Sequence, residues 1–265
     1  MVKPAAATAT VAPSPVHVLT PEYYDRLAAL EATHWWWRGV RRVTERVLAR
    51  SLAPDARALD AGCGTGRMLS WIAGQVSAAP VGLDRSEDAL RYCRARSHSR
   101  LLQGDAVSLP FPAETFDLAL SLDVIQHLPR PGGDSAALRD LARVLVPGGR
   151  LLLRTNSRCG YPEVDAPDYH RYTLTEVRDL LEDGGFACER LSYVNLAPAL
   201  ALTVWRTLRH RVPDRDPGLP SLPGRQGLTG WIGYRCLSLE AEFIRRVPVS
   251  LPFGHSILAL ARKRS

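Results

Sequence analysis

The segment ALDAGCGTG, residues 58–66, places glycine at every second position directly after a short apolar run. Glycines tolerate positive φ and let a ligand approach the backbone closely, and the helix expected to follow offers its N-terminal amides. The spacing G-x-G-x-G differs from the G-x-G-x-x-G of dinucleotide-binding oxidoreductases. Asp60 stands two residues before the first glycine, so its carboxylate would face the ligand, disfavour a pyrophosphate and favour an ammonium group.

Two further acids follow at the expected ends of the next strands. Asp84 ends the run VGLD, and Asp105 follows Gln103-Gly104 at the end of a third strand. In open α/β folds ligands bind at the carboxyl edge of the sheet, and a carboxylate about 20 residues after the glycine loop reaches ribose hydroxyls. Each Asp alone could equally be a turn former or a helix N-cap. Three in order after a glycine loop indicate a ligand site.

The rest of the chain alternates short apolar runs with helix-period segments, which is typical of parallel strands joined by helices. We therefore predict an α/β fold. The predicted strands are 58–60, 80–84, 101–104, 116–122, 150–155, 187–194 and 256–262. The predicted helices are 66–76, 86–97, 134–145 and 175–183, the last with a Thr173–Glu176 capping box.

The flanks divide into a tail, a cap and an insertion. Residues 1–20 are rich in Ala, Thr and Pro and are predicted to be a disordered tail, and 21–265 form one domain. Residues 21–51 carry two helical patterns and are predicted to be an N-terminal cap. The insertion 196–250 holds helices at 198–211 and 229–247 around the Pro- and Gly-rich loop 212–224. It mixes apolar residues with Arg, which favours a lid over a hydrophobic acceptor, with contact to anionic lipid as the alternative.

The composition of the chain limits the classes of protein to which it can belong. The 265 residues are 46% hydrophobic and carry a net charge of +7, but the basic residues are dispersed, which favours a solvated surface over a nucleic-acid groove. Five scattered cysteines argue against a disulfide framework or a zinc site, and no metal site is expected. The longest apolar stretch has about ten residues, so no membrane span is predicted. A cytoplasmic protein, monomer or homodimer, with no nucleic-acid partner is expected.

The ordered motifs resemble those of the class I S-adenosylmethionine-dependent methyltransferases. ALDAGCGTGR resembles their first motif, VGLDRS the second, QGDAVSLPFPAETFDLALSLDVIQHL the central block and RVLVPGGRLLLRT the fifth-strand segment. The resemblance covers residues 55–190. It implies a Rossmann-like seven-stranded sheet with order 3-2-1-4-5-7-6, sandwiched by helices, in which the last strand is antiparallel. It also implies S-adenosyl-L-methionine as the cofactor.

Carried over by position, the resemblance implies a cofactor role for specific residues. Asp60 and Gly62 would meet the methionine moiety, and Asp84 the ribose. Asp105 and the amide of Ala106 would meet the adenine, and Leu122 would lie beneath the sulfonium. The same candidate site includes Gly64, Gly66 and Arg85.

The flanking segments HWWWRGVRR, DYHRYTLTEVRDLLEDGGF and PFGHSILALARK resemble a bacterial subgroup associated with tailoring of secondary metabolites, including antibiotics, or of glycans. On a helix the three adjacent tryptophans point about 100° apart, so they cannot all face one core. We expect Tyr24, Trp36 and Arg38 to close over cofactor and substrate, and His170, Arg171 and Tyr172 to project toward substrate. Packing of the cap and bonding within the loop are the respective alternatives.

Methyl transfer from a sulfonium is an in-line displacement in which the protein mainly positions the reactants. An alcohol or ammonium acceptor must also lose a proton. His127 follows the fourth predicted strand, and histidine suits a general base near neutrality, so His127 is the first candidate and His170 the second. The predicted reaction is methylation of an O or N atom of a small molecule. A cyclase or binding protein on the same fold, and an RNA methyltransferase, are the alternatives.

Overall fold

A computed structural model describes residues 20–159, 170–209, 227–247 and 250–264. The predicted tail 1–20 lies outside this part except for Thr20, and so does the loop 212–224. The helices are α1 (Pro21–Thr33), α2 (Trp35–Leu48), α3 (Arg67–Ala73), α4 (Glu87–Ala95), α5 (Gly133–Val144), α6 (Leu174–Asp183), α7 (Leu196–Arg209) and α8 (Leu228–Arg246), with the short 3-10 helix η1 (Ile125–His127). The strands are β1 (Ala58–Ala61), β2 (Val81–Asp84), β3 (Leu101–Gln103), β4 (Phe116–Leu122), β5 (Leu145–Asn156), β6 (Phe186–Val194) and β7 (Ser256–Lys263).

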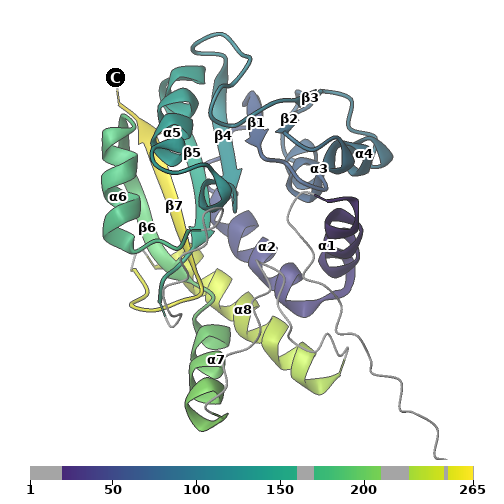
Figure 1. Cartoon of the computed structure of the whole chain (residues 1–265), viewed down its shortest axis with the longest axis vertical. Helices are drawn as coiled ribbons and strands as arrows, with labels where there is room; N and C mark the ends of the chain where they lie inside the picture. Colours follow the sequence, from purple (N-terminus) through teal and green to yellow (C-terminus); the bar gives the residue numbers. More distant parts are fainter. Residues whose placement is uncertain (1–19, 160–169, 210–226, 248–249, 265) are drawn as a thin grey trace, which may run out of the picture.

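The strands form one seven-stranded sheet in the order β3-β2-β1-β4-β5-β7-β6 (Figure 1), which confirms the predicted topology. β1 pairs in parallel with β2 and with β4, and β4 pairs in parallel with β5. β7 lies between β5 and β6 and is antiparallel to both. The strand order reverses between β1 and β4, and crevices for ligands form at such a switch point.

Helices cover both faces of the sheet because successive strand residues point to opposite sides. On one face, Leu59 and Leu151 pack against Leu138 and Leu141 of α5 and against α6. On the other face, alternate residues such as Leu120 and Leu152 pack against α2, α3 and α8. Both faces are apolar, so the central strands are nearly continuous hydrophobic runs, as expected for a buried parallel sheet.

Side-chain hydrogen bonds within the same few residues explain where two of the helices begin. The Thr173–Glu176 capping box is present at α6, and the Thr20 hydroxyl accepts a hydrogen bond from the Tyr23 amide at α1. β5 is longer than predicted and begins at Leu145. The strand passes through Gly148, which has φ +75°, and the β4–β5 register shifts at Phe116 to absorb the irregularity.

The described part of the insertion, helices α7 and α8, does not line the pocket described below. Helix α8 instead packs along the back of α2. Gly39 on α2 leaves room for the Leu237 side chain, and Gly233 on α8 lies against the Trp35 ring. α2 thus stands between α8 and the site. Among the described residues, no helix has the length and apolarity needed to span a bilayer.

Candidate active site

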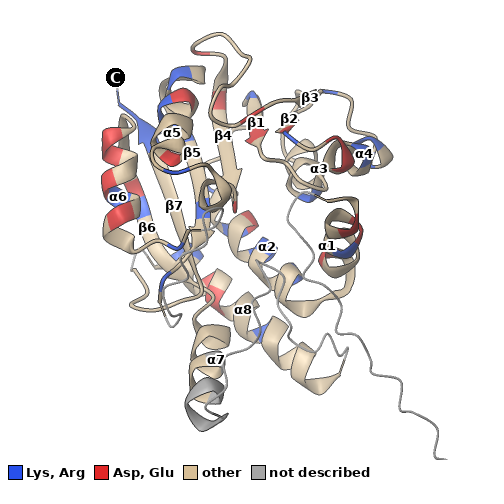
Figure 2. Cartoon of the chain, in the orientation of Figure 1, with Lys and Arg blue, Asp and Glu red and all other residues tan. Residues whose placement is uncertain are grey.

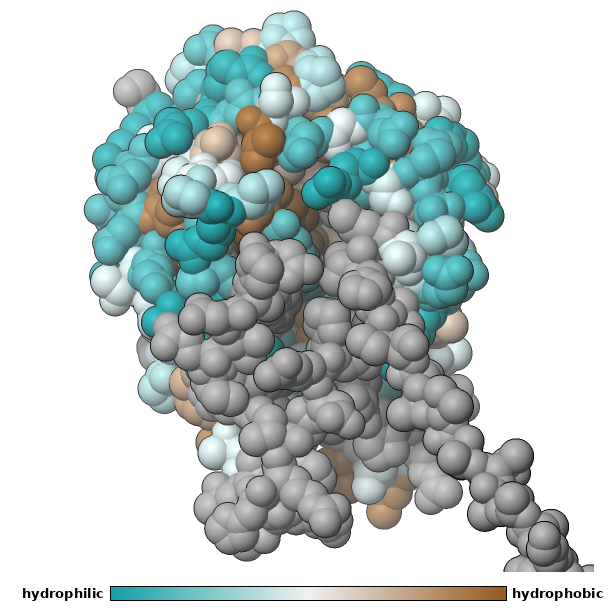
Figure 3. All heavy atoms as spheres, in the orientation of Figure 1, coloured by the Kyte–Doolittle hydropathy of each residue, from teal (hydrophilic) through white to brown (hydrophobic). Residues whose placement is uncertain are grey.

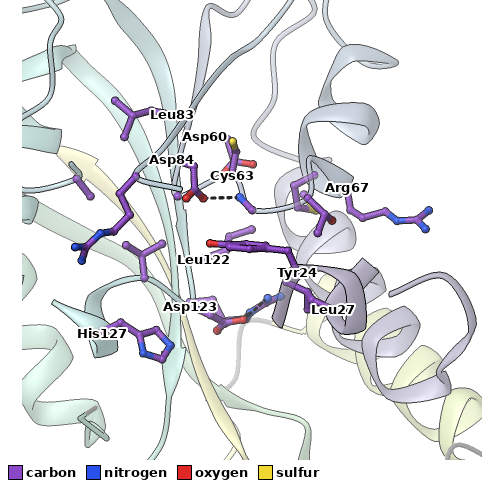
Figure 4. Close-up of a pocket in the computed structure, with 18 of the residues that line it drawn as sticks. Tyr24, Leu27, Asp60, Cys63, Arg67, Leu83, Asp84, Leu122, Asp123 and His127 are labelled. Atoms are coloured by element: carbon purple, nitrogen blue, oxygen red, sulfur yellow. Dashed lines mark hydrogen bonds and ion pairs between the residues drawn. The ribbon is translucent and has the colours of Figure 1, made fainter. Parts of the chain in front are cut away.

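A pocket opens where β1, β2 and β4 end, and α1 and α2 close its other side (Figure 4). Its cavity measures about 200 Å³. Eight of the nine sequence-predicted cofactor residues line it, at the strand ends and in the glycine loop: Asp60, Gly62, Gly64, Asp84, Arg85, Asp105, Ala106 and Leu122. The structure therefore brings the acids of three strands to one crevice.

Gly66 is the one predicted cofactor residue outside the pocket lining. It has φ +79° and precedes α3, and a Cβ there would lie 2.8 Å from the Cys93 sulfur. Its backbone conformation and the close approach of α4 explain this glycine without a ligand. Gly62 and Gly64 also have positive φ, and the amides of Gly62 and Cys63 both donate to the Leu83 carbonyl, which ties the loop to β2.

Asp60 is buried, and its Oδ1 atom has no hydrogen-bond partner among the described residues. Burial, with a smaller contribution from the negative charge of Asp84, raises the pKa of Asp60 to about 7, whereas Arg154 acts to lower it. A buried carboxylate oxygen without a donor is costly unless a ligand supplies one. Its position fits the ammonium group of an amino-acid moiety, which supplies both the donor and the opposite charge.

The Asp60 pKa predicts a pH-dependent cofactor affinity. The ammonium group binds the deprotonated carboxyl group, so affinity for S-adenosylmethionine should fall about tenfold per pH unit below pH 7 and level off above it. Burial also raises the pKa of Asp84, which acts in the same direction. Calorimetric titrations from about pH 5.5 to 8.5 would measure this slope. In the Asp60→Asn variant, affinity should be low and its dependence on pH reduced; equal slopes in the two proteins would contradict the assignment.

Asp84 organises the loop that surrounds it. Its Oδ2 accepts a hydrogen bond of 2.8 Å from the Gly64 amide, and its Oδ1 one of 2.9 Å from the Ser86 amide. Each carboxylate oxygen has a second lone pair that can accept from a ligand hydroxyl. Asp105 differs, because its Oδ1 accepts a hydrogen bond of 3.1 Å from the Val107 amide two residues along the chain. The pair of ribose hydroxyls therefore fits Asp84.

Tyr24 of α1 reaches from the cap into the centre of the pocket. Figure 4 shows its ring crossing the cavity with the hydroxyl end toward the Asp84 side. The ring is buried, and burial together with the Asp84 charge raises the pKa of the phenol well above its usual value. The Thr65 hydroxyl also donates to Glu31 of α1, which joins the cap to the glycine loop. The cap is thus directly attached to the cofactor crevice.

The other two predicted cap residues do not line the pocket. Trp36 is buried behind the site, where it packs against Leu237 and stacks edge-on with His255 at a ring distance of 5.0 Å. The Arg38 guanidinium lies 4.8 Å from the Tyr234 ring of α8. Helical rotation places their neighbours Trp37 and Arg41 on the pocket side instead. Trp37, and not the predicted Trp36, is therefore the tryptophan of this cluster that lines the pocket.

His170, Arg171 and Tyr172 also lie outside the pocket lining. Tyr172 is fully buried, and its hydroxyl donates to Asp134 at 3.1 Å, so it is a core residue. The His170 amide donates to the Gln126 carbonyl, and an Arg171 guanidinium nitrogen donates to the Ser157 carbonyl. In the described structure these residues join the loop before α6 to β5 and η1 rather than projecting into the cavity.

Asp123 and Arg154 line the pocket but were not identified from the sequence. Arg154 donates to both carboxylate oxygens of Asp123, at 3.1 Å from Nε to Oδ1 and 2.6 Å from Nη2 to Oδ2. It also donates to the Thr44 hydroxyl of α2 at 2.8 Å. Asp123 has φ +59°, a strained conformation for a residue with a side chain and one that concentrates at functional sites. The signal for this pair is spatial, because 31 residues separate them.

His127 lines the pocket from η1, at the end nearer to Leu122 and Asp123 (Figure 4). It thus lies apart from Asp60 and Asp84. In the segments that the structure describes, no group of three or more His, Cys, Asp and Glu side chains could hold a metal ion.

Comparisons with known proteins agree with this geometry. A family model described as a methyltransferase domain matches residues 59–153. The ubiquinone/menaquinone biosynthesis C-methyltransferase of Syntrophotalea carbinolica is 36% identical over 228 residues, which cover 78% of this chain and 92% of that protein. The fatty-acid O-methyltransferase of Mycolicibacterium smegmatis is 37% identical over 119 residues, 43% of this chain and 41% of that protein. The chain spans 60% to 65% of the length of three other curated methyltransferases.

Among solved structures, the cyclase SpnF superimposes with a TM-score of 0.58 over 92% of this chain and 95% of that one, at 21% sequence identity. This likeness shows a shared fold.

Proposed function

We propose that this chain, which belongs to the S-adenosylmethionine-dependent methyltransferases, methylates an oxygen or nitrogen atom of a small molecule, which we take to be a secondary metabolite. The observation that carries the proposal is the buried Asp60 carboxylate with an unpartnered oxygen, adjacent to the Asp84 carboxylate. The two acids match a cationic amino-acid nucleoside and would repel a pyrophosphate.

In this proposal, different residues of the crevice bind different parts of the cofactor. Asp60 would hold the ammonium group, Asp84 the ribose hydroxyls, and Asp105 with the Ala106 amide the adenine. When bound there, S-adenosylmethionine supplies an electrophilic methyl group on a sulfonium. The carboxylates of Asp60 and Asp84 would also offset the positive charge of the ligand in a site that excludes much of the surrounding water.

The acceptor side of the pocket is mainly apolar and aromatic, with a few polar groups at its edge. The lining includes Leu27 and Trp37 of the cap and Leu128, together with the polar side chains of His127 and Asp123. A pocket of this composition suits a small organic acceptor that the polar groups orient. In this proposal His127 accepts the proton that an alcohol or ammonium acceptor loses during transfer.

Replacing His127 with alanine should slow turnover about 100-fold or more, the range for loss of a general base, and leave cofactor affinity unchanged. The affinity is preserved because His127 is apart from Asp60 and Asp84, which hold the charged parts of the cofactor. The matched control is His170→Ala, since His170 lies outside the pocket lining and its removal should not change turnover. Wild-type turnover in the His127 variant would remove it as the base.

The decisive experiment has two stages. Calorimetry first measures S-adenosylmethionine binding to the purified chain, and a panel of hydroxylated and aminated metabolites is then screened for release of S-adenosylhomocysteine. Binding with acceptor-dependent release supports the proposal. Binding with product formation but no release would indicate a cyclase. Release only with RNA, with steep salt dependence, would indicate an RNA methyltransferase.

A further inference from the structure

The outward face of α8 is apolar. Leu228, Ile232, Leu239 and Phe243 are spaced four, seven and four residues apart, which puts them on one side of the helix. Together with Trp231 they are 46% to 73% exposed. We call these five residues the α8 stripe. A surface helix normally presents polar residues to water, so an apolar stripe of this size marks a contact surface.

The opposite face of α8 already has a partner. Gly230, Leu237, Ala241 and Ile244 are buried, and Leu237 packs against the cap helix α2. The stripe is therefore on the side of α8 that points away from the fold. Figure 1 places α7 and α8 together at one end of the molecule, and Figure 3 shows hydrophobic atoms at the surface of that end. α7 adds Leu200 and Val204, which are also exposed.

Arginines outnumber acids beside the stripe, because Arg246 pairs with Glu242 and Arg235 remains as the excess positive charge. Arg235 and Arg246 are exposed on the same side of the helix, and the Arg235 guanidinium lies 5.8 Å from the Trp231 ring. The two acids nearby are already occupied: Glu242 pairs with Arg245 and Arg246, and Glu240 accepts from the amides of Asn195 and Leu196. Figure 2 shows α8 as mostly uncharged with few charged positions.

We propose that the α8 stripe binds the surface of an anionic lipid bilayer. Apolar side chains with a tryptophan and flanking arginines are the composition of helices that lie in a membrane interface, where the rings and aliphatic groups enter the acyl boundary and the arginines meet lipid phosphates. The net charge of +7 adds long-range attraction to such a surface. A second copy bound through the same face is the competing occupant, and gel filtration of the stripe variants distinguishes it from a bilayer.

The test is co-sedimentation of the full chain with vesicles of phosphatidylcholine alone and of phosphatidylcholine with about 30 mol% phosphatidylglycerol. We expect about tenfold stronger partitioning onto the anionic vesicles. The double variant Trp231→Ser/Phe243→Ser should lose about tenfold on those vesicles, and Arg235→Gln should reduce the preference for anionic lipid. Hydrogen exchange of the wild-type chain should show protection of α8 when vesicles are added.

Matched controls are Leu102→Ser, an exposed leucine on β3, and Arg139→Gln, an exposed arginine on α5; neither should change partitioning. Unchanged S-adenosylmethionine affinity in every variant shows that the fold is intact. The proposal is overturned if wild-type protein ignores both vesicles, if the stripe variants bind as well as wild type, or if α8 stays unprotected. It is also overturned if gel filtration finds a dimer that the stripe variants dissociate.

Discussion

Replacing Asp84 with alanine is expected to abolish measurable S-adenosylmethionine binding, with a loss of about 100-fold or more. Hydrogen bonds to a charged group are each worth about 1.5–3 kcal/mol, and two ribose hydroxyls would lose this acceptor. The same carboxylate also receives the Gly64 and Ser86 amides, so its removal leaves two loop amides without their acceptor. Isothermal titration calorimetry measures the affinity directly.

A control variant at a second acid separates the loss of the ribose acceptor from a general loss of negative charge. Asp117 on β4 pairs with Arg57 at the opposite end of the sheet, where the guanidinium Nε lies 2.9 Å from Oδ2. Asp117→Asn should therefore leave cofactor affinity unchanged. Retained binding in Asp84→Ala, or equal losses in the two variants, would refute the ribose assignment.

Replacing Gly62 with alanine is expected to have the second-largest effect, on stability and on cofactor binding together. Gly62 has φ +87°, and a Cβ there would overlap the Val124 side chain. The left-handed backbone costs a residue with a side chain about 1–2 kcal/mol, and overpacking adds about 1–3 kcal/mol. Because the loop also carries Gly64 beside Asp84, the displacement should weaken S-adenosylmethionine binding.

Gly148→Ala provides the matched comparison. Gly148 has φ +75°, nearly the same backbone strain, but a Cβ there would meet nothing within 4 Å. In both variants the free energy of unfolding should fall by the cost of the left-handed conformation. Only Gly62→Ala should also lose the free energy attributed to overpacking, and only this variant should lose cofactor affinity. Urea unfolding gives the two free energies. Equal losses in the two variants would show that the clash with Val124 is relieved at no cost.

Much of the cofactor crevice was predictable because it is built from strand ends. Asp60, Asp84 and Asp105 each follow a short apolar run, and parallel strands bring such ends to one edge regardless of what happens between them. The capping box at Thr173 was predictable for a similar reason, since its hydrogen bonds join residues three apart.

The acceptor side was not predictable in this way. Whether Trp36 or Trp37 faces the pocket depends on how α2 is rotated about its axis, and the close packing of Gly39 against Leu237 of α8 accompanies the observed rotation. The segment around Tyr172 looked like a substrate loop, but burial against Asp134 makes Tyr172 part of the core. Adjacent residues on a helix point about 100° apart, so an error of one position changes the assignment.

The sequence by itself therefore determined the α/β class, the order of the strands through the family resemblance, and the three acids that line the crevice, because these depend on periodicity and on residues near in the chain. Only the tertiary structure decided which cap residues enter the pocket, that Arg154 of β5 binds the strained Asp123, and that α8 packs against α2. These features depend on packing between elements far apart in the chain, and no local pattern encodes the rotation or spacing at which two such elements meet.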